Sequence, residues 1–302
     1  MGDWLLALLR ALHYVLLLGL FGVATYRLIG LRGLSCERFD ARARIGLLAA
    51  AVIALITSIM LMLAMIAGMM GQTIGELERE GLLAMVVGTS IGWAFVLRIG
   101  CLTGAAVALV VGGRSAFWVC ATLVAVALCT LPWSGHAAAG EGGIGLLHRA
   151  NDAVHLLSAG LWLGAIGWFL HLTALARRPE HRDLRLPLLA AMHCFAPVGA
   201  MLVLIVCLSG FVNAQMIFGI KATPDVLDTT YGWLLALKLL LVGVMIAFGG
   251  RNAIVVRRGT ARASTTDAML TSLRTSLRLE IGTAAVVVGT VAILGLMSPM
   301  LE

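Results

Sequence analysis

The sequence predicts an all-α protein that is embedded in a membrane and crosses it eight times. Hydrophobic residues make up 61% of the 302 residues and charged residues only 12%, which is about half the charged share of a soluble domain. The apolar residues are gathered into long, continuous runs. A spanning helix needs about 20 apolar residues, whereas a barrel strand alternates over about ten. The composition therefore excludes a soluble globule and a disordered chain, and the runs predict helices.

Eight runs are long enough to cross a membrane. In chain order, the predicted helices lie at residues 4–26, 45–69, 84–111, 116–134, 150–172, 190–216, 230–250 and 279–299. Each helix satisfies its own backbone hydrogen bonds, which lipid cannot do. The first run follows Asp3 rather than a basic cluster and is too long for a cleaved signal peptide, so we expect it to remain as a helix.

The basic residues predict how the chain is oriented. Sixteen of the 22 fall in loops on one side of the membrane, near residues 27–44, 112–117, 173–187 and 250–278. Loops rich in arginine stay in the cytoplasm, so both termini are predicted to be periplasmic, in a bacterial inner membrane. This topology accounts for the net charge of +7. We therefore expect the lipid bilayer as a partner and no nucleic acid.

Two spacings suggest an internal duplication. His13 and His155 are each followed nine residues later by glycine, Gly22 and Gly164. A Gly-Trp pair precedes a basic residue by the same distance twice, at 92–98 and 232–238, and Thr89 and Thr230 precede these pairs with a one-residue slip. The offsets of 142 and 140 predict two four-helix halves, residues 1–135 and 136–302, related by an axis along the membrane normal. Chance similarity between apolar helices is the alternative.

Charged and imidazole side chains inside the predicted spans are candidate functional groups, because such groups are costly in lipid. Arg10 and Asp152 lie three residues before His13 and His155, so each shares a helix face with its histidine. If the halves pack together, Arg10 could pair with Asp152 and bring the two imidazoles near one another as metal ligands. The alternative is that each histidine only bonds a neighbouring helix.

A second group of polar residues is interpreted as supporting. Arg98 and Lys238 are the basic members of the repeated Gly-Trp motif, and we favour a structural role for them, by snorkelling or by pairing with a carboxylate such as Glu280. Asn213 ends the sixth helix near the outer face and could line a cavity.

Methionine and further histidines cluster toward the predicted outer face. Met62, Met65 and Met69 form one stripe of the second helix. Thioethers suit Cu(I) and suit hard cations poorly, although methionine is also a common packing residue. Further candidate ligands on this side are Met216, His136 and His148.

Four segments in the second half form a set of motifs in a fixed order. They are the D-x-x-H-x(6)-W-L-G pattern from Asp152 to Gly164, Ser209-Gly210-x-x-Asn213-Ala214, Thr230-Tyr231-Gly232-x(5)-Lys238, and Ser276 to Glu280. Together these segments resemble the CopD copper-resistance family of membrane proteins. The resemblance covers about residues 150–300, and the first half resembles the family more weakly through His13, Gly22 and the Gly-Trp motif.

The resemblance implies an eight-helix inner-membrane protein, not an enzyme, that handles copper together with a periplasmic carrier of the CopC type. It implies that copper passes toward the cytoplasm, and it gives Asp152 and His155 the best functional assignment. Two alternatives stay open. One is a redox protein holding b-type haem between two histidines, and the other is a scaffold that inserts copper without transporting it.

Overall fold

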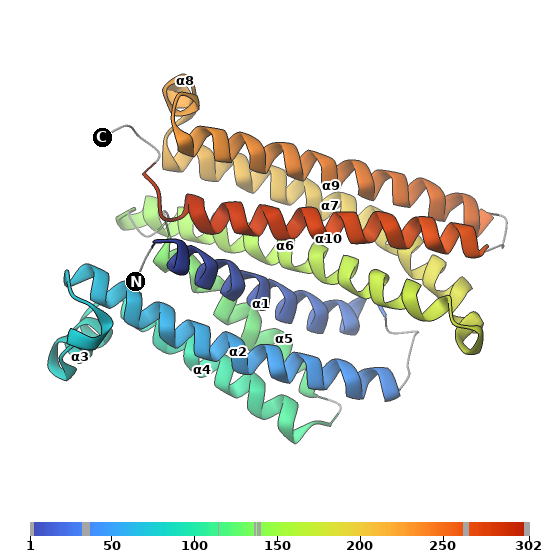
Figure 1. The fold of residues 1–302 in the computed structure, drawn as a ribbon, viewed down its shortest axis with the longest axis horizontal. Helices are drawn as coiled ribbons and strands as arrows, with labels where there is room; N and C mark the ends of the chain where they lie inside the picture. Colours follow the sequence, from blue (N-terminus) through green and yellow to red (C-terminus); the bar gives the residue numbers. More distant parts are fainter. Residues whose placement is uncertain are drawn as a thin grey trace.

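The computed structural model is a single bundle of long helices, which confirms the predicted fold class (Figure 1). The structure describes residues 3–31, 37–113, 115–135, 137, 140–261 and 266–298, and every regular element in that part of the chain is helical. Eight of these helices are long and apolar enough to cross a membrane. The predicted number of spans is therefore confirmed.

The eight long helices fall four to each predicted half. The first half holds α1 (Asp3–Ile29), α2 (Glu37–Met69), α4 (Ser90–Val111) and α5 (Ala116–Cys129). The second half holds α6 (Gly142–Ala176), α7 (Arg185–Ile217), α9 (Thr230–Ala261) and α10 (Asp267–Leu294).

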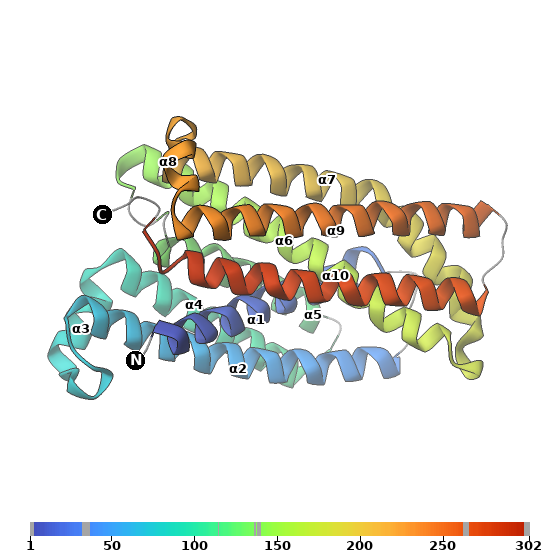
Figure 2. The same cartoon turned by 45° about the horizontal axis from the view of Figure 1, so that its top comes forward.

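Two short helices mark one end of the bundle. These are α3 (Arg79–Gly88) and α8 (Thr223–Leu227), and both lie where α1 begins and α10 ends (Figures 1 and 2). We call this the terminal end. The arginine-rich connections, including the ion pair between Arg185 and Asp267, belong to the opposite end. The membrane side that each end faces stays a prediction.

Several predicted boundaries differ from those in the structure. The run predicted as one helix over 84–111 breaks at Thr89, whose hydroxyl accepts a hydrogen bond from the Gly92 amide at 3.0 Å and so caps α4. The last helix begins at Asp267 rather than at residue 279. Boundaries predicted from apolar content alone were misplaced for two reasons. A side-chain cap can interrupt an apolar run, and a helix can extend beyond its apolar run into the polar interface.

The cap at Thr89 has a counterpart in the second half. The Thr229 hydroxyl accepts a hydrogen bond from the Gly232 amide at 3.1 Å. The equivalent of Thr89 is thus Thr229, not Thr230, and the offset of 140 holds without a slip. This correspondence supports the predicted duplication, which stays a prediction together with the division at residue 135.

Helices α1 and α6 pack closely along their glycines. A Cβ on Gly22 would stand 2.9 Å from both the Gly160 carbonyl carbon and the Gly164 Cα, so only glycine lets the two backbones meet here. Small residues are the usual way for membrane helices to approach. Nearby, the Trp168 indole donates a hydrogen bond to the Val23 carbonyl at 2.9 Å. The repeated glycines thus join the two halves.

Candidate functional site

His13 has one ring nitrogen committed to a hydrogen bond with the next helix. The side chain is fully buried, and its Nδ1 lies 2.8 Å from the Thr57 hydroxyl oxygen. That hydroxyl donates its only proton to the Ala54 carbonyl at 3.0 Å. It must therefore accept from His13, which assigns the proton of the neutral imidazole to Nδ1. Nε2 is left with a lone pair.

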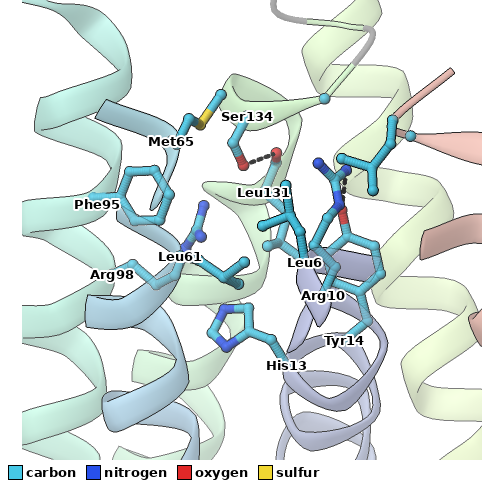
Figure 3. Close-up of a pocket in the computed structure, with 13 residues that line it drawn as sticks. Leu6, Arg10, His13, Tyr14, Leu61, Met65, Phe95, Arg98, Leu131 and Ser134 are labelled. Atoms are coloured by element: carbon cyan, nitrogen blue, oxygen red, sulfur yellow. Dashed lines mark hydrogen bonds between the residues drawn. The ribbon is translucent and has the colours of Figure 1, made fainter. Parts of the chain in front are cut away.

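His13 is one of the residues that line a cavity. Nε2 is buried and has no hydrogen-bond partner among the described residues, which is uncommon for a polar atom in a protein interior. The cavity has a volume of about 430 Å³ (Figure 3). Its polar and sulfur-bearing lining residues are Arg10, His13, Tyr14, Met65, Arg98 and Ser134. We call it the His13 cavity.

His155 repeats the arrangement in the second half. Its Nδ1 lies 2.9 Å from the Ser209 hydroxyl oxygen on α7, and that hydroxyl donates to the Ile205 carbonyl at 2.6 Å. The proton of His155 is therefore also on Nδ1, and Nε2 again carries the lone pair. Each half of the chain thus fixes one imidazole in the tautomer that metal ligation at Nε2 requires.

The charges around His155 are of both signs. Asp152 accepts a hydrogen bond from the Asn213 amide at 2.8 Å, and Asn213 in turn accepts one from Asn151 at 2.7 Å. Lys238 interacts electrostatically with both Asp152 and His155. A carboxylate thus offsets the lysine charge at this site.

Both charged side chains among the described residues that line the His13 cavity are positive. Arg98 is 1% exposed and donates to the Thr130 hydroxyl at 2.7 Å and to the Thr130 carbonyl at 3.0 Å. Its guanidinium also lies 4.6 Å from the centre of the Phe95 ring. Arg10 donates to the Tyr14 hydroxyl at 3.0 Å. No carboxylate is among the described residues that line the cavity.

The two histidines are bonded within their own halves. His13 contacts α2 and His155 contacts α7, and His155 is not among the residues that line the His13 cavity. We therefore interpret them as two sites. One ion shared between both rings stays a prediction, as does an ion pair between Arg10 and Asp152.

The other predicted ligands are spread over several places. Met65 lines the His13 cavity with His13, whereas Met62 and Met69 do not. Met216 is half-buried near the end of α7, and His148 is buried in α6. His136 lies outside the described residues. The described part of the chain holds no group of three or more His, Cys, Asp or Glu side chains arranged for a metal, so the roles of these ligands stay predictions.

Glu280 has a different neighbour from the one predicted. It is 2% exposed, and its carboxylate accepts a hydrogen bond from the Asn252 amide of α9 at 3.3 Å. Both residues line a second cavity, of about 320 Å³. Arg98 donates its hydrogen bonds to Thr130 rather than to Glu280. Within the described residues Arg98 and Glu280 therefore form no ion pair, and the pairing of Lys238 with a carboxylate such as Glu280 stays a prediction.

The fold and the site define a class: a multi-pass membrane protein with one hydroxyl-bonded histidine in each predicted half. Residues 1–146 match the family model of the copper resistance protein D-like N-terminal domain, and residues 189–294 match that of copper resistance protein D. The chain belongs to the copper resistance protein D family and is a copper-related membrane protein.

Two relatives match over nearly their whole length. Copper resistance protein D of Pseudomonas syringae pv. tomato is 34% identical over all of this chain and 99% of its own. The inner membrane protein YebZ of Escherichia coli strain K12 is 27% identical over 96% of this chain and 97% of its own. No solved structure matches the chain.

The hydroxyls that hold the imidazoles give a testable prediction. Ser209→Ala removes the group that fixes the His155 tautomer, and loss of such an outer partner commonly lowers metal affinity about 10- to 100-fold. We expect that loss in Cu(I) affinity, measured by competition with a chromogenic chelator. Ser158→Ala, a change on the same helix as His155, is the control and should leave the affinity unchanged; equal effects of the two would contradict the assignment.

Proposed function

We propose that the protein takes copper from a CopC-like periplasmic carrier and passes it across the inner membrane through histidine and methionine ligands. His13 and His155 act as separate nitrogen ligands, one in each half. No bond-breaking chemistry is involved, so the protein is not an enzyme in this proposal. The family membership supports copper as the cargo.

One observation carries the proposal. In both halves Nδ1 is bonded to a hydroxyl that cannot donate back, so Nε2 is left to bind an ion. If His13 and His155 only linked neighbouring helices, either ring nitrogen could carry the proton, and the same Nδ1–H tautomer would not be required at both positions. A neutral imidazole with a fixed outer partner is the usual form of a metal-ligating histidine.

The His13 cavity supplies a soft donor as well as a nitrogen. Met65 and His13 come from different helices, α2 and α1, and line the same space. A thioether beside an imidazole favours Cu(I) over hard cations. This supports Cu(I) as the transported form.

Met65 offers a matched comparison within one stripe. Met65→Leu keeps the volume and removes the sulfur, so we expect roughly tenfold weaker Cu(I) binding at the first-half site. Met69→Leu changes the same helix outside the cavity and should have no effect. The affinities are measured in a His155→Ala background, so that the measured Cu(I) affinity is that of the first-half site alone. Equal affinities for the two leucine variants would remove Met65 from the site.

Uptake into proteoliposomes tests the whole proposal. We expect protein-dependent Cu(I) accumulation in the lumen, which falls when His13 and His155 are both replaced by alanine. Copper binding without accumulation would indicate an insertion scaffold. A Soret band that survives chelation of copper would instead indicate a haem protein.

A further inference from the structure

The two arginines of the His13 cavity have no negatively charged partner among the residues that the structure describes. Arg10 and Arg98 line the same space and interact electrostatically with one another. Their described hydrogen bonds go to neutral oxygens, those of Tyr14 and Thr130. Nε of Arg10 is buried and has no hydrogen-bond partner in the part of the chain that the structure describes. Charges inside a membrane protein are normally paired with one another or directed into a water-filled space.

The two arginines reach the cavity from different helices, Arg10 from α1 and Arg98 from α4. In Figure 3, Arg98 and Arg10 extend from opposite walls, and His13 lies below them. The space is bounded at the terminal end by Ser134, Gly135 and Gly295, which places the cavity toward that end of the bundle. Two guanidinium groups around a small cavity form a good receptor for an anion, because each offers several N–H donors in a fixed plane.

We propose that the His13 cavity binds a small anion, a halide or a carboxylate, between Arg10 and Arg98. The anion accepts hydrogen bonds from both guanidinium groups and neutralises part of their charge. The second half does not need such a ligand, because Asp152 supplies the negative charge beside Lys238.

The anion also bears on the copper function proposed above. A bare copper ion at His13 Nε2 would be repelled by two positive charges, and a bound anion lowers that repulsion. Copper is then expected to occupy the His13 cavity together with an anion. The anion site itself does not rest on the copper proposal, and its test contains no copper, so the two can fail separately.

Thermal unfolding in detergent tests the anion site. Sodium chloride and sodium acetate are titrated in separate series into wild type, Arg10→Gln and Arg149→Gln. A ligand that binds only the folded protein raises the unfolding midpoint in a saturable way. Arg149 is the matched control, since it donates to the Gly140 carbonyl and does not line the cavity. General effects of ionic strength should shift all three proteins alike.

We expect saturable stabilisation of wild type and Arg149→Gln, with an apparent affinity at least about tenfold weaker in Arg10→Gln. Arg10→Lys keeps the charge and should restore part of the response, which separates charge from misfolding. The same response in Arg10→Gln and wild type would overturn the proposal. So would native mass spectrometry showing an anionic phospholipid retained by wild type and lost in Arg10→Gln, since a lipid headgroup would then be the occupant.

Discussion

Gly22→Ala is expected to destabilise the protein by more than about 3 kcal/mol, because the new methyl group would meet backbone atoms that cannot move aside. It would overlap the Gly160 carbonyl and lie 2.9 Å from the Gly164 Cα. Overpacking against movable side chains typically costs about 1–3 kcal/mol. Here the whole α1–α6 contact would have to open, and with it the Trp168 hydrogen bond to Val23.

Gly19 on the same helix is the matched control. A Cβ at Gly19 has no atom within 4 Å, so Gly19→Ala should be neutral or gain up to about 1 kcal/mol from helix propensity. Gly164→Ala and Gly167→Ala repeat the comparison on α6, since Gly167 is also open and Gly164 is not. Thermal unfolding in detergent reports the difference. Equal midpoints for the two alanines of α1 would contradict the packing of the halves.

His155→Ala is expected to lower Cu(I) affinity at the second-half site by at least about 100-fold, more than the loss of its outer partner Ser209. The substitution removes Nε2, which is the only nitrogen that the hydroxyl-bonded ring leaves available. His171→Ala is the control, because His171 lies two turns beyond Gly164 on the same helix and packs edge-on against Trp168. Chelator competition in a His13→Ala background measures the second site alone. Equal affinities for the two variants would remove His155 from the site.

The number and type of helices could be predicted from the sequence because lipid imposes long apolar runs. Helix boundaries were less accurate, since α10 begins about three turns earlier than its apolar run suggests. Composition does not report where a helix enters the polar interface. The cap at Thr89 could have been found from the pattern Thr-x-x-Gly, which recurs at Thr229.

The partners of the buried polar groups were the part that sequence reasoning missed. His13 and His155 were singled out correctly as buried or half-buried residues, but Thr57 and Ser209 were not recognised as their partners. Likewise, Thr130 holds Arg98. In a helix that is apolar all round, the sequence carries little information on which face meets which neighbour. A hydroxyl side chain within an apolar span, such as Thr57 or Ser209, was the available signal.

Copper stoichiometry in chloride-containing buffer tests the central claim most directly. In the proposed mechanism each histidine binds its own copper ion. Elemental analysis of Cu(I)-loaded, detergent-purified protein should therefore give two copper ions per chain. His13→Ala and His155→Ala should each retain one, and the double variant none. A wild type that binds a single ion, lost completely in either single variant, would show that both rings share one ion and would contradict the two-site account.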